Sequence, residues 1–182
     1  VSVQEALAAR GIEFEYAKGT DIESEDESGF PEALQAARRS DVVVMVVGES
    51  SAMSGEAASR TDIRLPGKQR ALIEAVLEAG KPVVLVLMNG RPLALQWEHD
   101  HVSAILETWF PGTSGGHAVA DVLYGDHNPS GHLTVTFPRN LGQVPIFYNV
   151  KNTGRPVDDE VEPRFRSKYL DAPNTPLYPF GH

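Results

Sequence analysis

The sequence predicts an α/β fold in which a mostly parallel sheet is flanked by helices. Two stretches, residues 42–47 and 83–88, are apolar at every position, which is typical of parallel strands that are buried on both faces. Segments with apolar residues at helical spacing alternate with these stretches at short intervals, and such alternation favours βαβ units. Together the two observations predict an α/β sandwich with flavodoxin-like layering.

The first elements are predicted from local signals. Ser2 and Glu5 have the spacing of a capping box, which opens a short helix that Gly11 ends. Residues 12–16 alternate apolar and acidic side chains, the pattern of a strand with one exposed face. A proline at the start of residues 31–39 suits the first turn of a helix over that range.

The later elements follow the same alternation of strand and helix. Residues 66–80 begin with proline and glycine, repeat apolar residues at helical spacing and end with glycine, so they predict a helix. Residues 104–110 predict a third strand, and residues 114–123 a helix entered through two glycines. Residues 133–137 alternate apolar and polar side chains and predict an edge strand.

We expect a single domain, with the sandwich over residues 1–140 and an irregular, proline-rich arm over residues 141–182. The arm carries six of the chain's 13 prolines. Its scattered aromatic residues are more apolar than a disordered segment usually is. We therefore expect the arm to pack over a partner surface; the alternative is a disordered tail.

The composition excludes several classes of function. A formal net charge of −9 disfavours binding to nucleic acid or to an anionic membrane surface. The chain has no cysteine, which rules out disulfides, thiolate metal sites and thiol catalysis. It contains no run of about 18 apolar residues that would span a membrane. We interpret His99, Asp100 and His101 as a solvated turn and expect no metal site.

The most informative segment is the polar loop after the first buried strand, residues 48–62. It contains two glutamates, Glu49 and Glu56, seven residues apart. Ligands of open α/β sheets bind outside the carboxyl ends of the strands, and a buried carboxyl group in such a place can serve as a proton donor. The alternative is that both glutamates are ordinary surface residues.

A second loop leaves other functions open. Residues 111–116 follow a strand and open a helix, as phosphate-binding loops do. Their glycines have the spacing of neither nucleotide-binding pattern, so close packing is favoured over phosphate binding. Two alternatives to an enzyme therefore remain, a domain that binds phosphate or nucleotide through this loop and an interaction module whose arm docks on a partner.

An ordered series of motifs spans the whole chain. The motifs are VVGESSAMSGEAASRTDIRLPGKQ, GKPVVLVLMNGRPLAL, TWFPGTSGGHAVADVLYGDHNPSGHLTVTFPR, GQVPIFYN, NTGRP and PLYPFG. The series resembles the second, C-terminal α/β sandwich domain of family 3 glycoside hydrolases of the periplasmic β-glucosidase type. In that family the domain begins with an apolar strand that has no match here, and it follows a (β/α)8 barrel. The resemblance therefore implies a fragment that lacks the first strand of the sandwich.

The resemblance also assigns roles within the polar loop. Retaining glycosidases use two carboxyl groups, a nucleophile and an acid/base, and in this family the nucleophile is an aspartate of the barrel, outside this chain. Ser54-Gly55-Glu56 is similar to the segment that carries the acid/base in relatives, so Glu56 is the first choice and Glu49 the second. Glu49 directly follows the strand, where we expect it to hold the loop by accepting backbone N–H groups.

Three further residues complete the implied site. Ser54, Arg60 and Asp62 are expected to bind substrate or to organise the loop. Arg60 and Asp62 can pair with each other or with Glu56, and for Arg60 a surface ion pair of little energetic value is the alternative.

The implied enzyme is a retaining, exo-acting β-glucosidase that removes terminal non-reducing β-D-glucosyl residues from oligosaccharides or aryl β-glucosides. A β-xylosidase or another exo-glycosidase of the family is the alternative. The resemblance implies no cofactor, and it makes the N-terminal (β/α)8 barrel the partner, so this chain alone is expected to be inactive. A homodimer is compatible with the resemblance, and the expected location is periplasmic or secreted.

Overall fold

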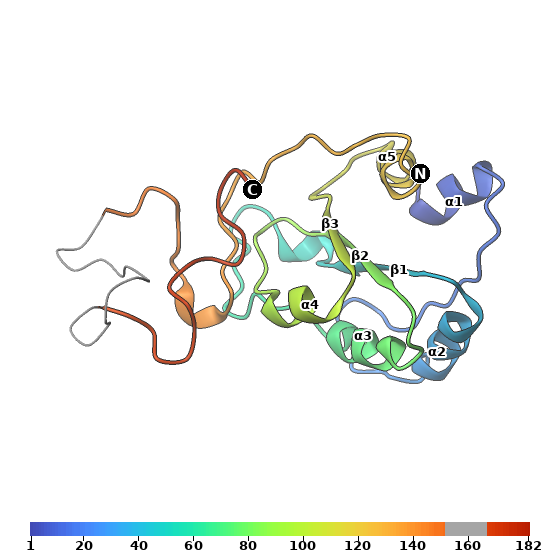
Figure 1. The fold of residues 1–182 in the computed structure, drawn as a ribbon, viewed down its shortest axis with the longest axis horizontal. Coiled ribbons are helices and arrows are strands. Elements are labelled where there is room, and N and C mark those ends of the chain that lie inside the picture. Colours follow the sequence, from blue (N-terminus) through green and yellow to red (C-terminus); the bar gives the residue numbers. More distant parts are fainter. Residues whose placement is uncertain (152–166) are drawn as a thin grey trace.

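The structure is a computed structural model that describes residues 1–151 and 167–182. The chain begins with two helices, and from the second helix to the last one helices and strands alternate (Figure 1). The elements are α1 (Val3–Ala9), α2 (Phe30–Arg39), β1 (Val43–Gly48), α3 (Gln69–Leu77), β2 (Val83–Met88), α4 (Gln96–His101), β3 (Ala104–Glu107) and α5 (Gly115–Leu123), with short 3₁₀ helices at Ser51–Met53 and Leu141–Gln143. The NTGRP motif and the middle of the arm lie outside the described residues.

The strands form one parallel sheet in the order β1-β2-β3. The register places Gly48 beside Met88 and Leu87 beside Glu107, so all three strands end at the same edge. This arrangement confirms the α/β class and the parallel sheet. It also brings together the residues that directly follow or end the strands.

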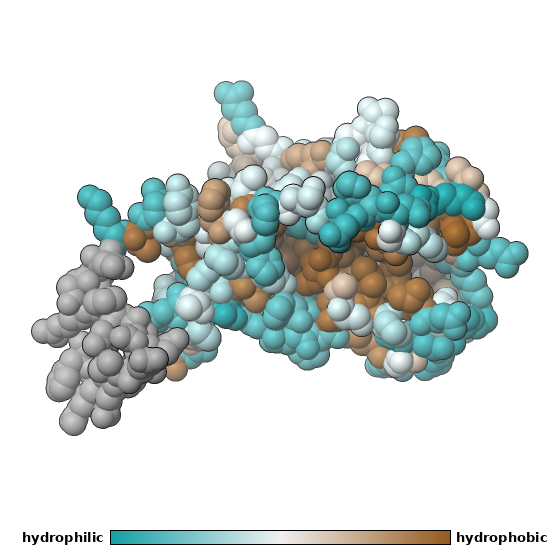
Figure 2. All heavy atoms as spheres, turned by 45° about the horizontal axis from the view of Figure 1, so that its top comes forward, coloured by the Kyte–Doolittle hydropathy of each residue, from teal (hydrophilic) through white to brown (hydrophobic). Residues whose placement is uncertain are grey.

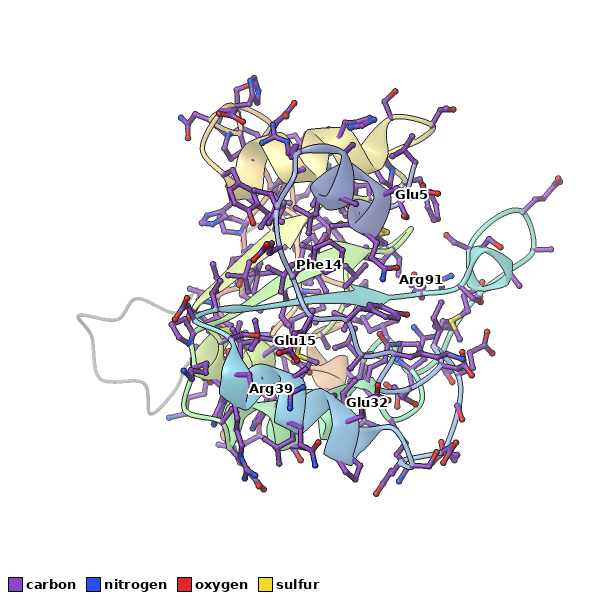
Figure 3. The ribbon with its side chains drawn as sticks, turned by 90° about the vertical axis from the view of Figure 1, so that its right-hand side faces the viewer. Glu5, Phe14, Glu15, Glu32, Arg39 and Arg91 are labelled. Atoms are coloured by element: carbon purple, nitrogen blue, oxygen red, sulfur yellow. The ribbon has the colours of Figure 1, made fainter. Side chains whose placement is uncertain are left out.

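Helices cover both faces of the sheet. Helices α2 and α3 pack together on one face, and α1 and α5 pack together on the other (Figures 1 and 3). Each face of the sheet has its own cluster of buried apolar side chains, and alternate residues of β2 point into one or the other. Leu85 and Leu87 belong to the larger cluster with Ile73 of α3, whereas Val86 belongs to the smaller cluster with Val119 of α5. Because both faces are buried, the strand is apolar at every position.

Two predicted strands differ from the structure at the carboxyl side of the sheet. The strand expected over residues 104–110 ends at Glu107, because the backbone of Trp109 takes a positive φ of 51°, which a strand does not allow. The edge strand expected over residues 133–137 is reduced to one antiparallel bridge between Phe137 and Tyr178.

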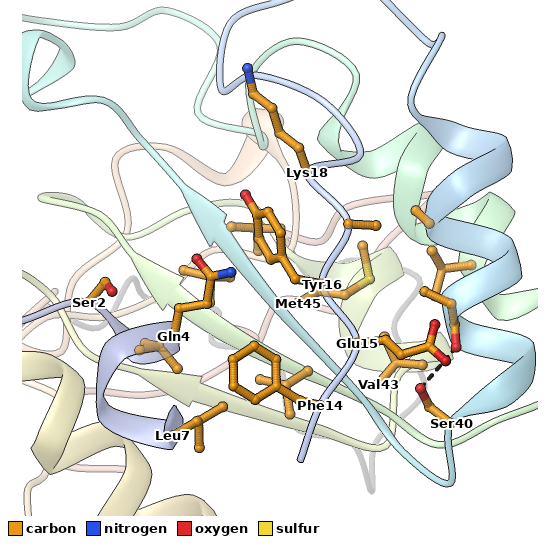
Figure 4. Close-up of a pocket in the computed structure, with 18 of the residues that line it drawn as sticks. Ser2, Gln4, Leu7, Phe14, Glu15, Tyr16, Lys18, Ser40, Val43 and Met45 are labelled. Atoms are coloured by element: carbon orange, nitrogen blue, oxygen red, sulfur yellow. Dashed lines mark hydrogen bonds between the residues drawn. The ribbon is translucent and has the colours of Figure 1, made fainter. Parts of the chain in front are cut away.

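The segment expected as a strand over residues 12–16 belongs to no strand. It runs beside β1, but a groove of about 1110 Å³ lies between them (Figure 4). Strands pair only at about 4.8 Å, so the groove explains why the segment adds no fourth strand among the described residues. Phe14 and Tyr16 on one side and Val44 and Val46 on the other are exposed, and apolar side chains gather in this hollow (Figure 2).

The described parts of the arm pack back on the sandwich. Leu177 is buried in the larger core. Gln143 Nε2 donates to the carbonyl oxygens of Pro173, at 2.8 Å, and Thr175, at 3.2 Å. His99 and His101, expected in a turn, lie in α4, and His99 Nδ1 is 2.8 Å from the Tyr178 hydroxyl. No helix of the described residues is long and apolar enough to cross a membrane.

Candidate active site

The end of β1 is fixed before the polar loop begins. Gly48 has a φ of 145°, and a Cβ there would lie 2.0 Å from the carbonyl oxygen of Met88, so only glycine allows this close approach. The buried side chain of Gln69 accepts from the Gly48 N–H at 2.8 Å and donates to the Gly48 carbonyl at 2.8 Å. Helix α3 therefore clamps the point from which the loop departs.

Glu49, the next residue, has a fully buried side chain. Its Oε1 accepts a hydrogen bond from Arg60 Nη1 at 2.7 Å. The same oxygen lies 2.9 Å from Arg91 Nε and forms an ion pair with it, although the N–H is not aligned for a hydrogen bond. Its Oε2 accepts from the Gly90 N–H at 3.2 Å. A buried carboxylate is stable when charged partners and hydrogen bonds replace water, and Glu49 has both.

The two arginines connect Glu49 to the middle of the loop and to its far end. Arg91 Nη2 donates to the carbonyl of Met53 and, at 3.4 Å, to that of Ala58, and Arg60 Nη2 donates to the Arg64 carbonyl at 3.0 Å. In Figure 3 the loop extends away from the body of the molecule, and Arg91 lies at its base.

The distal part of the loop carries Ser54 and Glu56. Ser54 packs over Gly90, where a Cβ would come within 2.0 Å of its Oγ. Glu56 is exposed and lies between Gly55 and Ala57, which both have positive φ. A tight turn closed by the Gly55–Ala58 bridge thus presents the carboxyl group to the outside. Glu49 and Glu56 share one loop but not one site.

Asp62 pairs with a neighbour that the sequence analysis did not consider. Its Oδ1 accepts from the backbone and side chain of Arg64, both at 3.0 Å. The Arg64 guanidinium lowers the pKa of Asp62 to about 2, against a smaller opposing effect of burial. Arg60 and Asp62 therefore do not pair with each other, and neither pairs with Glu56 in this structure.

Sequence reasoning missed Glu107, at the end of β3. Burial raises the pKa of Glu107 to about 7, although hydrogen bonds from the Trp109 N–H and the Asn89 side chain favour its charged form, and the nearby Glu49 adds a small increase. The donor–acceptor distances are 2.8 Å from Trp109 N to Oε1 and 3.2 Å from Asn89 Nδ2 to Oε2. An acidic residue inside an apolar strand was the only signal in the sequence.

The glycine loop before α5 is engaged in packing. The Gly116 N–H donates to the Val1 carbonyl at 3.2 Å, and a Cβ on Gly116 would lie 2.2 Å from the Ser2 carbonyl oxygen. Close packing of α5 against the start of the chain thus accounts for this glycine. The described residues contain no group of three or more His, Cys, Asp or Glu side chains placed to hold a metal ion.

The polar loop has a buried base that fixes it and an exposed end that carries Glu56. The buried Glu49 carboxylate and its two arginines fix the loop on the carboxyl edge of the sheet. The exposed carboxyl group of Glu56 lies outside this edge. A carboxyl group that is presented in this way can exchange protons with a molecule bound between this domain and a second surface.

Known proteins are similar to this chain in sequence and in fold. A model of the glycosyl hydrolase family 3 C-terminal domain matches residues 1–182. The periplasmic beta-glucosidase of Salmonella typhimurium is 59% identical over 151 residues, which are 83% of this chain and 20% of that protein. A beta-xylosidase of Formosa agariphila is 46% identical over 174 residues, which are 93% of this chain and 22% of that protein.

Solved structures agree with these sequence relatives. The beta-glucosidase from Listeria innocua in complex with isofagomine matches with a TM-score of 0.93 and 41% identity, over 100% of this chain and 25% of that one. The chain thus spans about a fifth to a quarter of the length of these relatives. A family model over its full length, close sequence relatives and a matching fold give one answer: this chain belongs to glycosyl hydrolase family 3 and is a C-terminal domain of that family.

Proposed function

We propose that this chain supplies the acid/base loop of a retaining exo-β-glucosidase, with Glu56 as the acid/base. The rest of the active site, including the nucleophilic aspartate, lies in the (β/α)8 barrel of the same enzyme. The observation that carries the proposal is the contrast between the buried anchor of the loop and its exposed end. Glu49 is neutralised by two arginines, whereas Glu56 is free to meet a second domain.

The proposed chemistry uses Glu56 twice. In the first step its carboxyl group donates a proton to the glycosidic oxygen, while the barrel aspartate attacks the anomeric carbon and the leaving alcohol departs. In the second step the Glu56 carboxylate takes a proton from water, whose oxygen displaces the aspartate and restores the carboxyl group. Arg60 and Asp62 organise the ends of the loop, and Ser54 lies on the same stretch as Glu56.

The proposed substrates are oligosaccharides and aryl glycosides with a terminal non-reducing β-D-glucosyl residue. Relatives named beta-glucosidase and beta-xylosidase both match this chain, so a β-xylosyl substrate is the second candidate. The name of the Salmonella relative favours a periplasmic enzyme. The barrel is the proposed partner and no cofactor takes part.

The test replaces Glu56 with alanine in the complete enzyme. Loss of a general acid should slow hydrolysis of a disaccharide by about 10²–10⁴-fold, whereas an aryl glycoside with a good leaving group needs little protonation and should lose less in the first step. The second step then lacks its base, so the covalent intermediate should accumulate and give a burst. Azide needs no deprotonation and should restore turnover with a β-glycosyl azide as product.

Glu49→Ala is the matched control on the same loop. It should lower the stability of the enzyme and show no rescue by azide, because its carboxylate is occupied by Arg60 and Arg91. Azide rescue of Glu49→Ala but not of Glu56→Ala would reverse the two assignments. Rescue of neither variant would place the acid/base outside this chain.

A further inference from the structure

Three polar side chains stand in a row at the carboxyl edge of the sheet. Glu49 follows β1, Asn89 follows β2 and Glu107 ends β3. Asn89 is fully buried and Glu107 is partly buried. Only Glu49 has a role in the arrangement described so far, and the other two form a separate connection to the polar loop.

Asn89 is the centre of this connection. Its Nδ2 donates both to Glu107 Oε2, at 3.2 Å, and to the Arg91 carbonyl oxygen, at 2.8 Å. Arg91 in turn holds the carbonyl oxygens of Met53 and Ala58, on either side of Glu56. An unbroken chain of contacts therefore runs from the Glu107 carboxyl group to the loop that carries Glu56.

The hydrogen bonds to Glu107 are those that an ionised carboxylate accepts. Both of its oxygens accept N–H groups, one from Trp109 and one from Asn89. A proton on Oε1 would face the Trp109 N–H, and a proton on Oε2 would face the Asn89 amide. The Asn89 Oδ1 atom is buried and has no hydrogen-bond partner. If the amide turns, Oδ1 can accept the Glu107 proton, but Nδ2 then leaves the Arg91 carbonyl.

We infer that Glu107 is a positioning residue for the Glu56 loop, acting through Asn89 and Arg91, and that only its ionised form makes the connection. Uptake of a proton by Glu107 turns the Asn89 amide, releases the Arg91 backbone and loosens the loop. The inference rests on the proposed function for its effect on catalysis, since the loop matters to turnover only if Glu56 takes part.

The surroundings of Glu107 determine the pH at which its carboxyl group takes up a proton. Within the described part of the chain, Glu49 is the charged group that acts on the Glu107 carboxyl, and Arg60 and Arg91 face Glu49 in turn. Burial and, less strongly, Glu49 oppose ionisation, whereas the N–H groups of Trp109, Asn89 and Thr108 favour it, and together they bring the pKa of Glu107 to about 7. The connection is therefore made above neutral pH and lost below it.

The test compares the complete wild-type enzyme with Glu107→Gln over pH 5–9. Glutamine has about the same size but never ionises, so it should resemble the acid form at every pH. We expect kcat/KM of the variant to be about 10-fold lower above pH 8, as for other changes that displace a catalytic group slightly. The ratio of wild type to variant should fall towards one below pH 6, with a midpoint near pH 7. Other titrating groups cancel in this ratio.

A second readout does not depend on activity. A glutamate-specific protease should cut after Glu56 in both enzymes, and the variant should be cut faster than wild type at pH 8 but equally fast at pH 6. This ratio would still titrate if Glu56 were not the acid/base, so the two proposals fail separately. It also decides the matter if the catalytic ratio is masked by a slow step elsewhere.

Glu98→Gln is the matched control. Glu98 is a buried glutamate of α4 whose pKa burial also raises, and the charged groups that act on it are Arg70, Glu74 and His101. It acts in turn on Arg64, just beyond the polar loop, but within the described residues it makes no hydrogen bond to Asn89 or Arg91. The corresponding ratios for this variant should stay flat over the whole range. Flat ratios for Glu107→Gln in both experiments, or equal titration for Glu98→Gln, would overturn the inference.

Discussion

At the scale of single residues, burial divides two glutamates that look alike in the sequence. Glu49 has no exposed side-chain surface and contacts two arginines, whereas Glu56 is exposed at a turn. Position along the chain explains the difference: the residue next to a strand end is held by the neighbouring strand, and a residue seven positions later can lie outside the sheet. The N–H group that Glu49 accepts is that of Gly90, which follows the end of the neighbouring strand β2.

Replacing Glu49 by glutamine tests the anchor. The change leaves the guanidinium groups of Arg60 and Arg91, which are 16% and 17% exposed, without their counter-charge. Removal of one partner from a buried ion pair costs about 3–5 kcal/mol, and we expect a decrease of that order in the free energy of unfolding, measured with urea. Asp62→Asn, at an exposed pair with Arg64, should cost less than about 1 kcal/mol. Equal losses would mean that Glu49 is not an anchor.

The sequence predicted some of these residues and missed others for a physical reason. The loop and its two glutamates were found because a polar segment after an apolar strand is a local signal. The arginine partners of Glu49 and Asp62 were not found, because Arg91 is distant in the chain from Glu49 and Arg64 competes for Asp62 at short range. Glu107 was missed because its environment comes from Asn89 on the adjacent strand, which only the register brings close.

At the scale of elements, β1 and β2 were predicted within one residue because apolar runs buried on both faces leave a strong pattern. Residues 12–16 carry an equally clear alternation, yet they form no strand. A strand depends on its neighbour, and here a groove stands where the neighbour would be. We propose that an additional strand, in line with the one the family resemblance implies, fills this groove in the complete enzyme.

Two valines in register provide a test of that proposed strand. Val46 of β1 and Val86 of β2 are partners, but Val46 is 49% exposed in the groove and Val86 is fully buried. In the isolated chain, Val46→Thr should change the free energy of unfolding by less than about 0.5 kcal/mol. Val86→Thr buries an unpaired hydroxyl and should cost about 1–3 kcal/mol.

The same pair of variants should behave differently in the complete enzyme. If a strand covers Val46 there, Val46→Thr should become as destabilising as Val86→Thr, as measured by thermal unfolding of the domain. A cost for Val46→Thr that stays small in the complete enzyme would show that the groove remains open and that the sandwich has no further strand at that edge.

At the scale of the whole molecule, this chain accounts for about a fifth to a quarter of the length of its relatives. We propose that its candidate site is one half of a larger site, because the exposed Glu56 carboxyl group faces outward, whereas the buried Glu49 carboxylate is occupied by ion pairs. The polar loop and its anchor are complete within the chain, so the domain can carry a preformed loop to a second surface.

The most direct test of this account is the separation of two carboxyl groups in a crystal structure of the complete enzyme with a glucose-like inhibitor bound. If Glu56 is the acid/base of a retaining enzyme, its carboxyl group should lie about 5–5.5 Å from that of the barrel nucleophile, on either side of the anomeric centre. A separation of about 6.5–9.5 Å would indicate an inverting enzyme instead. A Glu56 that points into solvent while another carboxyl group stands in its place would contradict the account.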